Sequence, residues 1–209
     1  MNITLMYPKF PFWRAEVSRL ALHLGGIEFE NRHPTREEFR AAKEDGSLPF
    51  GQMPVMIVDG QTIAQTGAIA RFCGKLSGMY PTNDPLAAAK IDQLIDAATD
   101  ITNQVGLTMR EKDDEKKMAA RTVLANETLP TWFGYLEALA PEEGSEFYVG
   151  DTMTIADLAI WRLLGWLTGG ILDGVPPTVT DGFPKLQAHA KRLASNPKIQ
   201  SWMHENYGP

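Results

Sequence analysis

The chain has 209 residues, of which 44% are hydrophobic and 22% charged, values typical of a globular protein with a core. Its formal net charge is −6 and no run of Lys and Arg reverses this locally, which argues against a nucleic-acid or anionic-membrane partner. There is no secretory signal pattern and no apolar stretch of the roughly 18 residues that a membrane span needs. The single cysteine, Cys73, excludes an intrachain disulfide. These features predict a cytoplasmic protein.

The first part of the chain mixes strand and helix patterns. ITLMY, residues 3–7, predicts a short strand. From Glu16 the apolar residues recur at helical spacing, and Gly25–Gly26 predicts the end of that helix. IEFE, residues 27–30, alternates apolar and acidic residues and predicts a second, half-buried strand.

The next segment predicts a helix, a hairpin and another helix. Thr35 and Glu38 have the spacing of a capping box. VMIV and QTIA flank Asp59–Gly60, which suits a type I′ turn between two strands. Residues 68–76 return to helical spacing. The predicted order is therefore β-α-β-α-β-β-α.

Turn-forming residues at 77–85 predict a linker, and the sequence beyond them is almost purely helical. The helical patterns lie in residues 87–109, 115–139 with a kink near Pro130, 154–169 and 184–195, followed by a short helix or turn after Pro197. The sequence therefore predicts two domains, an α/β domain over 1–79 and an all-helical domain over 85–209.

Pro54 opens the predicted strand VMIV, although a proline donates no ladder hydrogen bond. This element order, with a proline at this place, resembles the thioredoxin-like fold, which commonly has a cis proline there. A cis bond would turn the backbone groups of Met53 away from the sheet, where they could pair with an extended peptide-like ligand. A trans proline at a strand end is the alternative, and the element order alone leaves both open.

QTG, residues 65–67, directly precedes a predicted helix. The free N–H groups at a helix start attract a carboxylate. Thr66 could contribute its hydroxyl to such a site, or it could be a plain N-cap, which is the simpler interpretation when this motif is taken alone.

Four segments together resemble a glutathione transferase, most closely the sigma class: RAEVSRLAL (14–22), LPFGQMPVMIVDG (48–60), QTGAIARF (65–72) and TIADLAIW (154–161). In the last of these, Thr154 and Asp157 resemble the capping box that starts a buried helix of the family. The resemblance implies a two-domain fold, a cis Pro54, a homodimer, glutathione as co-substrate and no metal.

The resemblance also implies how glutathione is held. Gln52 and Met53 match the residues that hold the cysteinyl backbone. Gln65 and Thr66 match a Gln-Ser pair that binds the γ-glutamyl end. Lys43 matches a lysine near the glycyl carboxylate.

Two positions concern the ends of the ligand. Phe39 stands where the family often has a tryptophan, so an indole donor is missing. Asp100 matches an acid that reaches the γ-glutamyl ammonium bound by the neighbouring subunit. Alternatively, Asp92, Asp96 and Asp100 form a solvated acidic face, because their spacing is that of one side of a helix.

Tyr7, at the end of the first strand, is the candidate catalytic residue. Glutathione attacks as a thiolate, and a phenol O–H that donates to the sulfur would lower the pKa of a thiol from its usual value of about 8.5. Arg14 would favour the anion further. In the family this tyrosine usually lies six residues before the arginine of RAE, whereas here Tyr7 lies seven residues before Arg14. We expect the extra residue to bulge in the loop.

A hydrophobic electrophile is expected to bind beside the thiol. The candidate lining residues are Phe10, Phe12, Trp13, Leu107 and Tyr207. QVGL, residues 104–107, lacks an aromatic that some relatives have, so prostaglandin-type isomerase activity is not indicated. Cys73 lies on an apolar helix face and is expected to be inert core.

The resulting prediction is a dimeric transferase that conjugates glutathione to small apolar electrophiles. The alternatives are a non-catalytic structural or interaction relative and a glutathione-dependent peroxidase or isomerase. A thiol-disulfide oxidoreductase is disfavoured because no cysteine follows the first strand.

Overall fold

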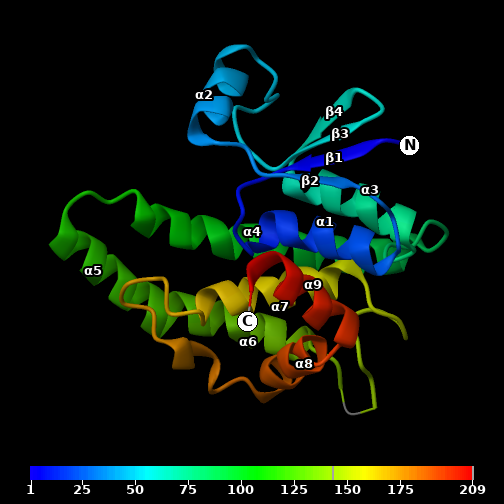
Figure 1. The fold of residues 1–209 in the computed structure, drawn as a ribbon. Helices are drawn as coiled ribbons and strands as arrows, with labels where there is room; N and C mark the ends of the chain where they lie inside the picture. Colours follow the sequence, from blue (N-terminus) through cyan, green and yellow to red (C-terminus); the bar gives the residue numbers. More distant parts are fainter. Residues whose placement is uncertain (143, 209) are drawn as a thin grey trace.

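The computed structural model describes residues 1–142 and 144–208, which form an α/β domain followed by a helical domain (Figure 1). The α/β domain has the predicted element order. Its elements are β1 (Ile3–Met6), α1 (Trp13–Leu24), β2 (Glu30–Arg32), α2 (Arg36–Glu44), β3 (Val55–Val58), β4 (Gln61–Ala64) and α3 (Thr66–Ser77). The sheet order is β2-β1-β3-β4, with β1 parallel to β2 and antiparallel to β3. This is the thioredoxin-like arrangement that the sequence predicts.

Local sequence signals explain most of these boundaries. The capping box of α2 is present, with the Glu38 N–H donating to the Thr35 hydroxyl across 3.1 Å. Asp59 and Gly60, between β3 and β4, both have positive φ angles, 47° and 84°, as a type I′ turn requires.

The second strand lies further along the chain than 27–30, the range predicted from alternation. The residues after α1 first close that helix, because the Ile27 N–H donates to the Leu22 carbonyl across 2.9 Å and Gly26 has a φ of 67°. The chain joins the sheet only at Glu30.

The helical domain contains six α-helices among the described residues. They are α4 (Pro85–Met109), α5 (Asp114–Val123), α6 (Leu129–Leu139), α7 (Ile155–Leu167), α8 (Pro184–Ala194) and α9 (Pro197–Tyr207). The capping box of α7 is present as predicted, with the Thr154 N–H donating to Asp157 across 2.8 Å. A short 3-10 helix at Pro177–Thr180 was not expected.

The kink expected near Pro130 is a turn of π-helix, Leu124–Thr128, between α5 and α6. Proline offers no N–H to the helix ladder, and here the ladder shifts by one residue just before it, with the Leu129 N–H donating to the Leu124 carbonyl.

Helix α1 lies at the centre of the molecule. It packs against α3 within its own domain and against α7 of the helical domain, and one continuous hydrophobic core runs through both. In Figure 1, α1 and α3 lie on the sheet face turned toward the helical domain, whereas α2 lies outside and has no buried residue. Across 1–142 and 144–208, no helix combines the length and apolar character needed to cross a bilayer.

Candidate active site

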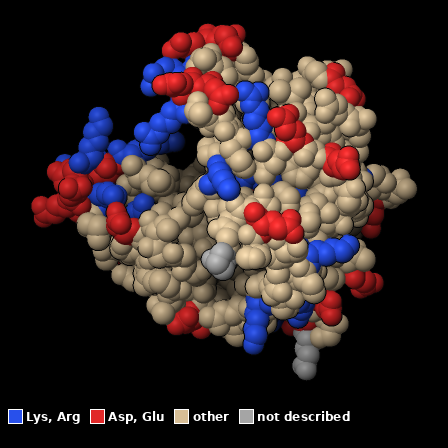
Figure 2. Space-filling model, in the orientation of Figure 1, with Lys and Arg blue, Asp and Glu red and all other residues tan. Residues whose placement is uncertain are grey.

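The register of the sheet brings three candidate residues, Tyr7, Pro54 and Gln65, to the same end of the sheet. Met6 of β1 pairs with Val55 of β3, and Val55 pairs with Ala64 of β4. The next residues outward are Tyr7, Pro54 and Gln65, so all three lie at the same end of their strands. This end faces the space between α2 and the α4–α5 connection in Figure 1, where the surface in Figure 2 is hollowed.

Tyr7 is held by its backbone. Its N–H donates to the Arg32 carbonyl across 3.1 Å, which extends the β1–β2 pairing by one step. Its carbonyl accepts from Arg19 Nη2 at 3.1 Å and lies 2.9 Å from Nδ1 of His33. Within the described chain its hydroxyl has no hydrogen-bond partner. The O–H is therefore available to a ligand.

The electrostatics around Tyr7 favour the protonated phenol. Burial raises the pKa of Tyr7, and the nearby charges of Arg14 and Arg19 lower it by less. Burial likewise lowers the pKa of Arg14, which Tyr7 partly offsets. The Arg14 guanidinium carbon lies 5.4 Å from the centroid of the Trp13 ring, and no hydrogen bond joins the guanidinium to another described residue. Tyr7 is thus a donor beside an unpaired cation.

The Met53–Pro54 peptide bond is cis. Pro54 is buried, Met53 is half-buried and Gln52 is exposed. The strand β3 begins only at Val55, and neither backbone group of Met53 bonds to another of the described residues. An N–H and a carbonyl are therefore left free beside Tyr7.

The start of α3 is not capped by a side chain. Gln65 occupies the N-cap position, and Thr66 is the buried first residue of the helix, so Thr66 is not the plain N-cap that the motif alone suggests. Gln65 has φ 76° and ψ 123°, a strained conformation for a residue with a side chain. Strain of this kind concentrates at ligand sites, and the uncapped N–H groups can receive a carboxylate.

Helix α2 places two more candidates near Met53. Phe39 packs with Met53 against a small cluster of Met6, Leu48 and Val55. Lys43 is exposed, and its alkyl chain runs along Gly51 in the loop before Met53. Phe39 therefore contributes apolar packing, while the Lys43 ammonium is free to meet an anion.

Asp100 differs from its two neighbours on α4. Arg71 of α3 pairs with Asp92 at 2.6 Å and with Asp96 at 3.4 Å, and the Tyr80 hydroxyl donates to Asp92 at 3.1 Å. Asp92 is thus partly buried in an ion pair with α3, whereas the Asp96 side chain is 69% exposed, as the alternative of a solvated acidic face expects. Asp100 is exposed and forms no ion pair with any described residue.

The structure separates the five residues expected to line the electrophile site. Phe10 and Leu107 are 39% and 62% exposed and can contact a ligand. Trp13 is wholly buried, and Phe12 is 9% exposed with its ring 4.7 Å from that of Trp166. These two assignments are wrong, because α1 begins at Trp13 and turns both rings toward the helical domain.

Tyr207 is half-buried, and its hydroxyl is engaged within the protein. Its hydroxyl donates to Glu16 Oε2 at 2.5 Å and accepts from Arg19 Nη1 at 2.9 Å. These bonds make Tyr207 part of the network around Arg19, and its place in the electrophile site stays a prediction. No motif in the sequence pointed to Arg19 or Arg162, which both bond to the loop after Tyr7. In the sequence, each of these arginines stands out only as a charged residue at a position where the helical spacing predicts an apolar core residue.

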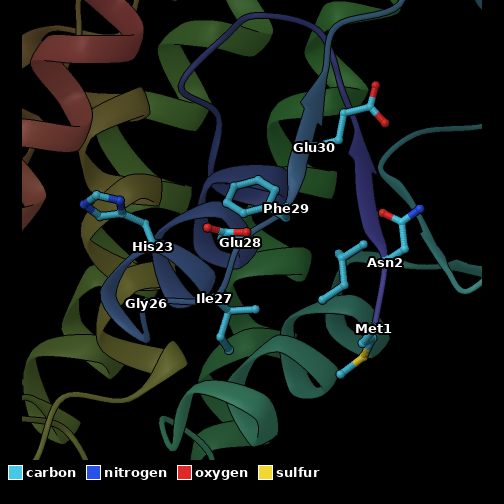
Figure 3. Close-up of a pocket in the computed structure, with 9 residues that line it drawn as sticks. Met1, Asn2, His23, Gly26, Ile27, Glu28, Phe29 and Glu30 are labelled. Carbon is cyan, nitrogen blue, oxygen red and sulfur yellow. The ribbon is translucent and has the colours of Figure 1, made fainter.

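Cys73 is fully buried, and burial raises the pKa of its thiol to about 12. A separate cavity of about 720 Å³ lies at the other end of β1 (Figure 3). It is lined by Met1, Asn2, Ile3, His23, Gly26, Ile27, Glu28, Phe29 and Glu30. It contains none of the residues gathered around Tyr7.

Comparison with known proteins agrees with this geometry. A family model described as "Glutathione S-transferase, N-terminal domain" matches residues 4–74, and one described as "Glutathione S-transferase, C-terminal domain" matches residues 99–206. "Glutathione S-transferase 1" of Ascaris suum is 31% identical over 198 residues, covering 91% of this chain and 90% of the relative. The chain belongs to the glutathione S-transferase family.

Solved structures share the whole fold of this chain. Prostaglandin synthase D of Nilaparvata lugens is 25% identical with a TM-score of 0.86, covering 100% of both chains. A monomeric transferase, Na-GST-3 of Necator americanus, is 30% identical with a TM-score of 0.80, covering 98% of this chain and 97% of that one. Membership makes this protein an enzyme that uses glutathione as its co-substrate.

Proposed function

We propose that glutathione lies along the sheet edge formed by Tyr7, Met53–Pro54 and Gln65–Thr66. The free N–H and carbonyl of Met53 would pair with the cysteinyl backbone, as an added strand would. The uncapped start of α3 would receive the γ-glutamyl carboxylate, helped by the Gln65 amide and the Thr66 hydroxyl. The observation that carries this proposal is that donors and acceptors without partners converge at one end of the sheet.

The glycyl end of glutathione would lie toward α2. Lys43 is exposed there and would pair with the glycyl carboxylate, and Gln52 would add a side-chain hydrogen bond. Phe39 would form the apolar floor beneath them.

Catalysis would rest on the Tyr7 hydroxyl. Because burial raises its pKa, Tyr7 stays protonated at neutral pH and can donate to the sulfur of glutathione. A donor to the thiolate lowers the thiol pKa, and a shift of two units corresponds to about 2.7 kcal/mol. Arg14 would stabilise the same anion, since its guanidinium lies beside Tyr7 without another partner.

The electrophile would be a small apolar molecule held against Phe10 and Leu107, the two candidates that the structure leaves exposed. Conjugation to such a molecule, the role in detoxification that goes with it, and a sigma-like class are our proposal. Peroxidase or isomerase turnover by the same thiolate is the alternative, and the similarity to a prostaglandin synthase D is the observation that keeps the isomerase alternative.

A homodimer with shared sites is proposed on the basis of Asp100. This carboxylate is exposed and unpaired among the described residues, as expected of a group that binds a ligand held by a neighbouring subunit. A transferase of similar fold is monomeric, so the oligomeric state needs a direct measurement.

The deciding experiment compares wild type with Tyr7→Phe in a rate assay with glutathione and a chloronitrobenzene. We expect wild type to bind a glutathione column and to turn over, and Tyr7→Phe to bind with little turnover. Full activity in Tyr7→Phe would overturn the catalytic assignment. Binding without turnover in the wild type would favour a binding module, and turnover of a prostaglandin or peroxide alone would favour the other chemistry.

A further inference from the structure

The loop between β1 and α1, residues 7–12, is held by an arginine through its backbone. Arg19 of α1 donates from Nη2 to the carbonyls of Tyr7 at 3.1 Å and Pro8 at 3.3 Å, and from Nη1 to the carbonyl of Phe10 at 3.4 Å. Arg19 is wholly buried, so the donor side of these bonds is shielded from water.

A second arginine binds the same loop from the helical domain. Arg162 of α7 donates from Nη2 to the carbonyl of Pro11 across 2.7 Å. Its guanidinium carbon also lies 4.9 Å from the centroid of the Trp161 ring. The loop is therefore attached both to its own domain and to the domain that packs on α1.

Arg19 is itself fixed by a buried network. Glu16 pairs with Arg19 Nη1 at 3.1 Å, with both side chains at 0% exposure. Glu16 accepts from Trp202 Nε1 at 2.5 Å and from the Tyr207 hydroxyl at 2.5 Å, and Asn31 accepts from Arg19 Nε at 2.9 Å. Helix α9 thus completes the arginine's surroundings, and it lies beside α1 in Figure 1.

Apart from the anchoring of Tyr7 to β2 and the packing of the buried Phe12 ring on Trp166, the middle of the loop has few other contacts that define its backbone. Its internal backbone bonds are two short-range ones, from Phe10 N–H to Pro8 O at 2.7 Å and from Phe12 N–H to Phe10 O at 2.8 Å. Planar guanidinium groups with several fixed donors are suited to hold a set of carbonyls in one geometry.

We propose that Arg19 and Arg162 are positioning residues which, through the backbone of this loop, set where the Tyr7 hydroxyl lies. Tyr207 contributes by holding the Arg19 guanidinium in place. The inference rests on the proposed role of Tyr7. A misplacement of about 1 Å can cost up to about a hundredfold in rate, so loosening the loop should be visible in kcat.

The test uses Arg162→Met and Tyr207→Phe, which remove a donor and a hydroxyl but keep most of the side-chain volume. Matched controls are Arg192→Met, which removes an arginine bond to the Glu146 carbonyl, and Tyr135→Phe at an exposed ring. We expect kcat to fall about tenfold in Arg162→Met and about threefold in Tyr207→Phe, with the KM for glutathione within about twofold of wild type. Arg162→Lys should recover most of the rate, and hydrogen exchange of the 7–12 backbone should accelerate only in the two test variants.

Unchanged exchange in this loop would overturn the inference, whatever happens to the rate. A higher KM for glutathione at unchanged kcat would also overturn it, since binding rather than positioning would then depend on the loop. If the wild type itself fails to ionise glutathione, measured by thiolate absorbance, the proposed function fails instead. The exchange measurement still decides in that case whether the two arginines hold the loop.

Discussion

The indole Nε1 of Trp13 donates a hydrogen bond to the Thr102 hydroxyl across 2.7 Å, with both side chains buried between α1 and α4. This bond joins the α/β domain to the helical domain at a position that the sequence would assign to a ligand pocket. It gives Trp13 a role in stability rather than in substrate contact.

Thr102→Val should therefore destabilise the fold. The Trp13 N–H would stay buried without an acceptor, which costs about 1–3 kcal/mol of unfolding free energy. Denaturant unfolding measures this, and the KM for the electrophile should not change. Thr99→Val is the matched control, because that hydroxyl bonds only to its own helix, at the Ile95 carbonyl. Equal losses in the two variants would contradict the cross-domain role of the bond.

The pH dependence of the rate should separate the phenol from the thiol. The pKa of Tyr7 is raised, so in the wild type the acid limb of the kcat/KM profile reports ionisation of glutathione's thiol. If Tyr7 donates to the thiolate as proposed, Tyr7→Phe removes a hydrogen bond to a charged group worth about 1.5–3 kcal/mol, and that limb should move up by roughly one to two pH units. At neutral pH the variant then has less thiolate and a lower rate. An unmoved limb would show that another group stabilises the sulfur.

Substituting Gln65 with glycine or with alanine tests whether the backbone is strained at this position. Both Gln65→Gly and Gln65→Ala remove the amide, so both should weaken glutathione binding by a similar factor, about tenfold. Because φ is 76°, the glycine variant should be more stable than the alanine variant by about 1 kcal/mol, the reverse of the usual order. Thermal unfolding and calorimetric titration with glutathione test both parts. A more stable alanine variant would show that the backbone is not strained there.

Cys73 should not react in the folded protein. Burial raises the pKa of its thiol to about 12, so at pH 8 almost none is thiolate, and the sulfur is inaccessible. A maleimide should label it only after denaturation, and Cys73→Ala should keep the wild-type kcat while losing about 1–2 kcal/mol of stability. Rapid labelling of the native protein would show that α3 opens readily.

Asp100 tests the shared site. If its carboxylate reaches the γ-glutamyl ammonium in a neighbouring subunit, Asp100→Asn should weaken glutathione binding about tenfold, the usual scale of a charge-assisted hydrogen bond. Asp151→Asn, at another exposed position of the helical domain, should have no effect. Sedimentation gives the oligomeric state, and a monomer with full affinity would eliminate the shared site.

Sequence motifs that span only a few residues correctly predicted the local structure. The capping boxes at Thr35 and Thr154 and the turn at Asp59–Gly60 are all present, because each depends only on its own short segment. The convergence of Tyr7, Pro54 and Gln65 follows from the strand order once the hairpin is placed.

Features that depend on packing between domains could not be predicted in the same way. Aromatic residues in a predicted loop are expected to form exposed binding surface. Phe12 and Trp13 are nevertheless buried, because α7 and α4 cover them. The buried Glu16–Arg19 pair looks like surface charge in the sequence, and two of its partners, Trp202 and Tyr207, lie 186 and 191 positions from Glu16. No short motif carries that information.

The hydrogen bonds that Arg19 and Arg162 make to the loop after Tyr7 go to its main-chain oxygens. Their bonds therefore do not depend on which amino acids the loop carries at its exposed positions, such as Lys9 and Phe10. Those positions are suitable for a mutant library that changes which electrophiles the enzyme accepts. Side-chain substitutions there leave the main-chain hydrogen bonds to the two arginines in place.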